Sequence, residues 1–446
     1  MRFLRFSQQR LIGGALVLAA LQFGASLMGL IRDRFLAQTF PGLGVVDVYI
    51  ASFRPSDLLF QVCIMAGFSV ALVPLFAKYF SNKDTKRMND LLSGVTGIAA
   101  LVFGVIALII ALFFDQIAPY IVQFEGESLE LYITFGRLAL ITNFLFVFGN
   151  AYGQYLITIQ KYWIYGLTPI LYTLGTIFGT VFLTSPEAFG SLGPMVGTLI
   201  GAIIYVIIRF IGVWSAGYSP KLKIWHPDIP ELIKLMIPRM VALGALQMQL
   251  LLFDTIASGL DAGSLTVNAY ARNFQAVAVG VAGIALAQSA FSLLSQSVAK
   301  KEVNRFWIYL RKGIFVLLLV TIPGAIALSF LAPVAAFLVS ISHKLDLFQV
   351  CLTIYAISIP FESINHLLLR AFYSLKQTVI PAVFSVINGG AAISISWILA
   401  PSYGVFALAI GFTIGQILQL IGLSLLLPYQ AEVTINRGSW LKRLIK

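Results

Sequence analysis

Long apolar runs separated by short polar joints dominate this sequence. A helix that crosses a bilayer needs roughly 20 consecutive, mostly apolar residues. Hydrophobic residues make up 59% of the 446 and charged residues only 11%, which is too little charge to cover a soluble domain of this length. We therefore predict an all-α polytopic membrane protein with about twelve transmembrane helices. The predicted spans are 11–31, 45–80, 91–114, 129–159, 163–184, 191–216, 231–259, 264–299, 305–338, 346–375, 377–400 and 403–428.

The charges in the joints predict the orientation of these helices. Lys and Arg concentrate on the cytoplasmic side of membrane proteins. Here they precede the first run and follow the even-numbered runs, whereas the opposite joints are mainly acidic, with Lys344 as an exception. We predict a bacterial inner-membrane protein with both termini in the cytoplasm. The basic residues behind the net charge of +12 lie in the joints and do not form a soluble basic face. We therefore expect no nucleic-acid partner.

Two pairs of similar segments predict an internal repeat. Residues 66–71 near the end of the second run resemble 282–287 in the eighth, and 159–161 after the fourth run resemble 375–377 after the tenth. Six spans in each half give both halves the same orientation, so we predict a parallel repeat. Two six-helix bundles of this kind would enclose a central cavity, which is typical of transporters. The predicted parts are an N-terminal bundle at 1–217, a cytoplasmic linker at 218–230, a C-terminal bundle at 231–428 and a basic cytoplasmic tail at 429–446.

Ionisable residues inside the apolar runs are the candidate functional residues. A charge in hydrocarbon costs at least about 2.5–3.5 kcal/mol, so each one needs a partner or a wet cavity. Arg32, Asp47 and Arg54 lie in or beside the first two runs, and Asp254 and Arg272 lie in the seventh and eighth. Guanidinium groups donate paired hydrogen bonds to phosphate oxygens, so we predict a cavity that binds an anionic headgroup. The alternative is a set of structural ion pairs that hold helices together.

Other intramembrane charges are assigned a different role. We place them near helix ends, where long side chains snorkel to the interface or pair structurally. They are Arg137, Arg209, Lys234, Arg239 and Glu362.

No motif for catalysis or metal binding accompanies these charges. His226, His343 and His366 are scattered without the spacing of metal ligands, and the sequence holds no GxxxxGK[ST] nucleotide motif. We therefore predict a transporter, not an enzyme, with no metal and no cofactor. A membrane glycosyltransferase would need a carboxylate cluster in a polar loop, and the predicted loops are short. A non-transporting scaffold is a further alternative. The GxxxG segment 197–201 predicts only close helix contact.

Several motifs are more specific. Near the start of the chain stand GLIRD at 29–33, DVYIASFR at 47–54 and GFSxAxVP at 67–74. Later stretches agree with them, namely Pro238 with Gln249 and Asp254, Tyr270-Ala271-Arg272, and LRAFYSLK at 369–376 followed by Pro381. Together they resemble the MurJ/MviN lipid II flippase family of the MATE-like multidrug/oligosaccharidyl-lipid/polysaccharide exporter superfamily. The resemblance covers nearly the whole chain.

This resemblance implies a flippase that moves an undecaprenyl-diphosphate-linked cell-wall precursor, lipid II, to the outer leaflet by alternating access, in peptidoglycan biosynthesis and hence cell shape. It places the substrate-binding residues of the family at Arg32, Asp47 and Arg272, with Arg54 where the family has a basic residue. Membrane potential or a cation gradient would drive transport, with Asp254 as a candidate coupling residue. The expected partners are the lipid-linked diphospho-sugar, the membrane and cell-wall synthesis enzymes, and a monomer would suffice.

The chain also departs from the family pattern. Arginines that the family carries six residues before Arg32 and late in the second helix are Ser26 and Phe60 here. Well-studied members have fourteen helices, and we predict twelve. A flippase for another polyprenyl-linked oligosaccharide is therefore an alternative, and a drug/cation exporter of the same superfamily is a second one.

Overall fold

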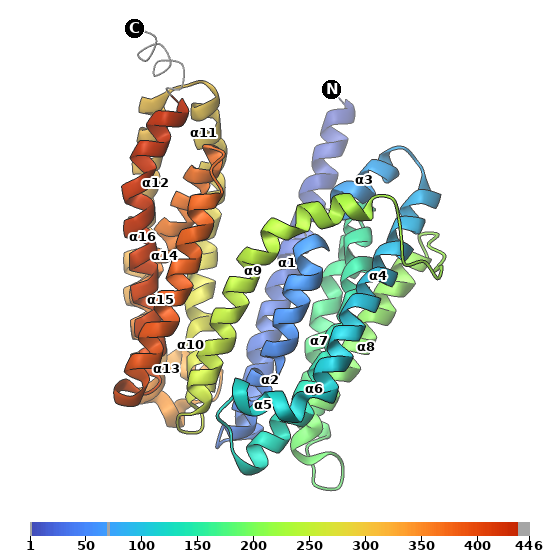
Figure 1. Cartoon of the computed structure of the whole chain (residues 1–446), viewed down its shortest axis with the longest axis vertical. Coiled ribbons are helices and arrows are strands. Elements are labelled where there is room, and N and C mark those ends of the chain that lie inside the picture. The colour runs from blue at the N-terminus through green and yellow to red at the C-terminus, as the bar shows by residue number, and fades with distance from the viewer. Residues whose placement is uncertain (1, 69–71, 436–446) are drawn as a thin grey trace. The chain divides into compact units, whose positions relative to one another are not determined.

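The structure, a computed structural model, describes residues 2–68 and 72–435, without the side chains of residues 2–15, 238 and 242. Within this part the chain is helical and no strand is present (Figure 1). Eleven of its helices are long and apolar enough to cross a membrane. They coincide with eleven of the twelve predicted spans. The span predicted at 45–80 consists of α2, a π-helical turn and α3, but residues 69–71 lie outside the described part, so the twelfth span stays a prediction.

The chain forms two compact units. Unit 1 is Met1–Leu251 with Leu338–Ser340, and unit 2 is Leu252–Phe337 with Ile341–Lys446. The first unit contains α1 (Arg2–Thr39), α2 (Gly44–Phe60), α3 (Val73–Ser81), α4 (Thr85–Leu112), α5 (Phe114–Ile121), α6 (Gly126–Thr158), α7 (Tyr162–Phe182), α8 (Gly193–Trp214) and most of α9 (Ile229–Ser258). The second contains α10 (Ser264–Ala278), α11 (Ala285–Ala299), α12 (Val303–Phe330), most of α13 (Ala332–Leu338), α14 (Leu345–Ser374), α15 (Val379–Tyr403) and α16 (Phe406–Ile435).

The unit boundary falls inside α9, because the start of this helix packs on unit 1. A Cβ placed at Gly67 would come within 2.9 Å of the Leu232 and Met236 side chains. The two predicted bundles and the linker at 218–230 stay predictions. Of the predicted basic tail, 429–435 forms the end of α16, and 436–446 lies outside the described residues.

A ladder of glycines joins α7 to α8 in unit 1. A Cβ at Gly175 would lie 2.5 Å from the Gly201 Cα, and one at Gly179 would lie 2.6 Å from the Gly197 Cα. The two backbones therefore touch, as the GxxxG spacing predicts.

Both units contain a π-helical turn, η1 (Gln61–Met65) after α2 and η4 (Val279–Ile284) after α10. The first turn directly precedes one copy of the segment that suggests the internal repeat, and the second turn overlaps the other copy. The repeat itself stays a prediction. Single π turns inside α-helices are frequent at functional sites. Here they follow the two helices that carry Arg54 and Arg272.

Candidate functional site

Arg32 lies in the second half of α1 and is held by its neighbour in the sequence. Its Nε and Nη2 donate to Oδ1 of Asp33 over 3.0 and 2.7 Å. Asp33 is 5% exposed, whereas the Arg32 side chain is 29% exposed. The aspartate therefore fixes the direction of a guanidinium that an anion can still approach.

Helix α2 carries the remaining predicted residues of unit 1. Asp47, in its first turn, is buried at 4% exposure, and Arg54 is half-buried. Their separation of seven residues, about two turns, places them on the same side of the helix.

Asp57, one turn after Arg54, is a further charge inside the second apolar run, although it is not among the predicted binding residues. Nδ2 of Asn143 on α6 donates to Asp57 Oδ1 over 2.9 Å and to Ser56 Oγ over 2.8 Å. These contacts join α2 to α6 within unit 1.

In unit 2, Arg272 on α10 is half-buried, and its guanidinium carbon lies 5.0 Å from the centre of the Phe412 ring of α16. Asp254 near the end of α9 is 3% exposed. Asn268 Oδ1, one turn before Arg272 on α10, accepts a hydrogen bond from the Tyr355 hydroxyl of α14 over 2.7 Å. This polar contact joins α10 to α14 beside Arg272.

Glu362 extends the polar network of unit 2 and corrects one expectation. It lies in the middle of α14, not near a helix end. Gln275 Nε2 donates to Glu362 Oε2 over 2.6 Å and to Ser358 Oγ over 3.1 Å, and His366 Nε2 is 3.9 Å from Glu362 Oε1. The predicted structural pairing of Glu362 is therefore right, whereas its predicted position near a helix end was wrong.

Arg209 on α8 does not snorkel either, because it is 1% exposed. Its guanidinium donates to Thr168 Oγ1 (2.8 Å), the Gly149 carbonyl (2.9 Å) and the Tyr165 carbonyl (3.1 Å). It also lies 4.0 Å from the centre of the Tyr205 ring. Neutral oxygens and aromatic faces surround this cation, which has a structural role in joining α6, α7 and α8.

Arg137 shows the pairing expected of a residue at the edge of the membrane. Its Nη2 donates to Asp115 Oδ2 over 2.7 Å and its Nε to the Ala111 carbonyl over 3.0 Å. Both side chains are substantially exposed, at 40% and 59%.

Half-buried guanidinium groups are thus present in both units, namely those of Arg32 and Arg54 in unit 1 and Arg272 in unit 2. Such groups can bind a phosphate or diphosphate through charge-assisted hydrogen bonds. Among the residues that the structure describes, no cluster of three His, Cys, Asp or Glu side chains is arranged to hold a metal ion.

Comparison with known proteins is consistent with this chemistry. The profile of the family described as "Lipid II flippase MurJ" matches residues 36–445. A "probable lipid II flippase MurJ" from Bdellovibrio bacteriovorus is 22% identical over 433 residues, which are 94% of this chain and 82% of the relative.

Two solved structures share the fold. A "Lipid II flippase MurJ, inward closed conformation" superposes with a TM-score of 0.77 at 22% identity and covers 96% of this chain and 92% of its own. An "inward-facing conformation of a multidrug resistance MATE family transporter of the MOP superfamily" gives 0.75 at 14% identity, with coverage of 95% and 99%. The eleven apolar helices and the family profile together show that this chain is a multi-pass membrane protein and that it belongs to the lipid II flippase MurJ family.

Proposed function

We propose that this chain is a lipid II flippase. It carries the undecaprenyl-diphosphate-linked precursor of peptidoglycan from the inner to the outer leaflet by alternating access. The observation that carries the proposal is the match to the MurJ family profile across residues 36–445. The arginines of the described helices supply the chemistry that such a substrate requires.

The diphosphate is the part of the substrate that most resists entry into hydrocarbon. Arg32 suits it, because Asp33 orients the guanidinium while 29% of the Arg32 side chain stays exposed. Arg54 and Arg272 are half-buried in the same manner and add two further charges of the same sign. We assign all three to the diphosphate and Asp47 to the positioning of Arg54.

A drug/cation exporter is the less well supported alternative. The similarity to the MATE transporter is one of fold, at 14% identity. A cationic cargo would favour acidic groups, whereas Arg32, Arg54 and Arg272 carry positive charge into the membrane-embedded part of this chain. These arginines favour an anionic cargo.

Further parts of the proposal follow from the family and the sequence. The chain lies in the bacterial inner membrane with both termini in the cytoplasm, works as a monomer and acts beside cell-wall synthesis enzymes. Membrane potential or a cation gradient drives transport. Asp254, an acidic residue that is 3% exposed within an apolar helix, is the proposed coupling residue.

Complementation tests this function. A bacterial strain depleted of its own lipid II flippase receives the wild-type gene, the Arg32→Ala variant or the Lys86→Ala variant. Lys86 is the matched control, because it is an exposed basic residue at the start of α4. We expect growth with wild type and Lys86→Ala and loss of growth with Arg32→Ala. Failure of the folded wild-type protein at normal expression would overturn the lipid II assignment. Full growth with Arg272→Ala would contradict the assignment of Arg272 to the diphosphate.

A further inference from the structure

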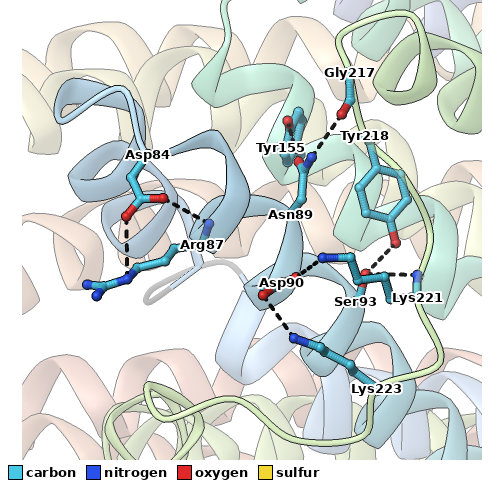
Figure 2. Close-up of polar contacts among 10 residues, drawn as sticks. All are labelled: Asp84, Arg87, Asn89, Asp90, Ser93, Tyr155, Gly217, Tyr218, Lys221 and Lys223. Atoms are coloured by element: carbon cyan, nitrogen blue, oxygen red, sulfur yellow. Dashed lines mark hydrogen bonds and ion pairs between the residues drawn. The ribbon is translucent and has the colours of Figure 1, made fainter.

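The segment 218–228, which follows α8, lies along α4 and is called the strap below. Lys221 Nζ and Lys223 Nζ donate to the two carboxylate oxygens of Asp90 over 2.6 and 2.8 Å (Figure 2). The Tyr218 hydroxyl is 3.1 Å from Ser93 Oγ, and the Lys221 backbone N–H donates to the same oxygen over 3.3 Å. The inner side of the strap is therefore fixed to α4 by polar contacts.

Further contacts secure both ends of the strap. Asn89 Nδ2 donates to the Gly217 carbonyl over 2.8 Å and is itself oriented by Tyr155, whose hydroxyl donates to Asn89 Oδ1 over 2.9 Å (Figure 2). At the other end the Tyr79 hydroxyl donates to Asp228 Oδ2 over 2.5 Å. The strap is thus bound along its length to the rest of unit 1.

The strap reaches the apolar part of α4. A Cβ at Gly97 would lie 1.9 Å from the Lys223 carbonyl oxygen, and one at Gly94 would lie 2.9 Å from that of Trp225. Residues 91–112 of α4 hold no Asp, Glu, Lys or Arg, and roughly 20 residues suffice to cross the hydrocarbon. The backbone of the strap therefore lies level with the first two turns of the membrane-crossing part of the helix.

The outer side of the strap is apolar and exposed. Leu222 is 108% exposed, Ile224 61% and Trp225 57%. In the sequence these three residues stand between or after Lys221 and Lys223, the two lysines that bind Asp90. The polar groups therefore face α4 and the apolar groups face outward. Exposed apolar side chains that adjoin one another in this way are typical of a surface that contacts a membrane or another protein.

Basic residues adjoin this apolar face. Lys221 and Lys223 flank Leu222 in the sequence, and each of their side chains is 41% exposed. Tryptophan is enriched at the membrane–water interface, and basic side chains near a bilayer surface attract anionic lipids. The alternation of apolar and basic residues therefore matches the chemistry of a lipid headgroup layer.

We infer that the strap is a membrane-interface anchor, in which Leu222, Ile224 and Trp225 insert into the boundary between the headgroups and acyl chains of anionic lipids. The ion pairs of Asp90 with Lys221 and Lys223 hold these three side chains at the depth of this boundary. The anchor thereby ties the connection between α8 and α9 to the bilayer surface, whatever substrate the protein carries.

Site-directed spin labelling tests the depth of the strap in the full-length protein. Cys63 and Cys351 are replaced by alanine, and a single cysteine at Leu222 is labelled in vesicles of phosphatidylethanolamine and phosphatidylglycerol. Power saturation compares collisions with oxygen, which concentrates in the membrane, and with the neutral water-soluble complex NiEDDA. Matched labels at Asn82, an exposed residue of a turn, and at Leu425, 73% exposed on α16, calibrate water and lipid.

We expect the oxygen-to-NiEDDA accessibility ratio at Leu222 to exceed that at Asn82 by about threefold or more and to approach that at Leu425. A ratio equal to that at Asn82, in a variant whose thermal unfolding matches wild type, would overturn the anchor and would mean that water or a soluble protein covers this face. Replacement of phosphatidylglycerol by phosphatidylcholine should lower the ratio at Leu222 and leave that at Leu425 unchanged. An unchanged ratio at Leu222 would refute the role of anionic lipids.

Discussion

Replacement of Arg209 by lysine should destabilise unit 1 although the charge is kept. The guanidinium makes three hydrogen bonds in three directions, to Thr168, Gly149 and Tyr165. A lysine ammonium is a single point on a flexible stem and can reach about one of these acceptors without movement of the helices. Two hydrogen bonds of a charged donor are then lost.

Each such hydrogen bond contributes roughly 1.5–3 kcal/mol, so the loss is about 3–6 kcal/mol before relaxation and about 3 kcal/mol if the helices partly adjust. For a unit of this size 1 kcal/mol corresponds to roughly 2–4 °C in melting temperature, which predicts a decrease of about 6–12 °C.

Thermal unfolding of the purified protein in one fixed detergent measures the decrease. Arg137→Lys is the matched control, because Arg137 also lies in an apolar helix but pairs with the exposed Asp115. An exposed pair contributes only about 0–1 kcal/mol, so the control should unfold close to the wild-type temperature. Equal melting temperatures for Arg209→Lys and Arg137→Lys would refute the role assigned to Arg209.

Two further predictions concern the strap. Gly97→Ala places a Cβ 1.9 Å from the Lys223 carbonyl oxygen. It should lower the free energy of unfolding by about 1–3 kcal/mol and speed tryptic cleavage of the strap. Gly324→Ala is the control that should show neither effect, because its Cβ meets no atom within 4 Å. Burial lowers the pKa of His226 below its ordinary value of 6.5. The unfolded chain then binds more protons than the folded one, so the stability contributed by neutral His226 is present above 6.5 and lost as the pH falls below it. Between about pH 7.5 and about pH 5.5 wild type should lose more stability than His226→Asn; equal losses would contradict this assignment.

Hydropathy was sufficient to locate most of the fold, because the requirement for a long apolar helix is local. The span predicted at 264–299 coincides with the helical run Ser264–Ala299. The span predicted at 305–338 was too long, since α12 ends at Phe330 and α13 follows as a separate helix. Composition does not show such a break, because both sides of the turn at Leu331 are apolar.

The candidate residues were only partly predictable. Arg32 and Arg272 were selected because a charge in an apolar run is conspicuous, but the partners that surround them depend on the packing of other helices. Asp57 is conspicuous for the same reason, but its partner Asn143 lies on another helix, α6, and could not be predicted from the sequence. Arg209 was predicted to snorkel or to pair structurally near a helix end, because a sequence does not reveal that the carbonyls of Gly149 on α6 and Tyr165 on α7 converge on it.

The strap shows the same limit in another form. The sequence shows that the strap contains apolar residues but not that they are exposed. The position of the strap depends on Gly94 and Gly97, because a side chain at either position would overlap the strap backbone. The carboxylate of Asp90 then selects the side of the strap that faces the helix.

Binding of the diphosphate headgroup to the purified protein tests the central proposal most directly. Calorimetry with a water-soluble short-chain lipid II analogue compares wild type with Arg32→Ala, Arg54→Ala and Arg272→Ala, and Lys86→Ala again controls for the loss of one positive charge. The proposed function predicts saturable binding that each of the three variants weakens by about tenfold or more, with Lys86→Ala like wild type. Equal binding by all of the proteins, or tighter binding of an organic cation than of the diphosphate analogue, would contradict it.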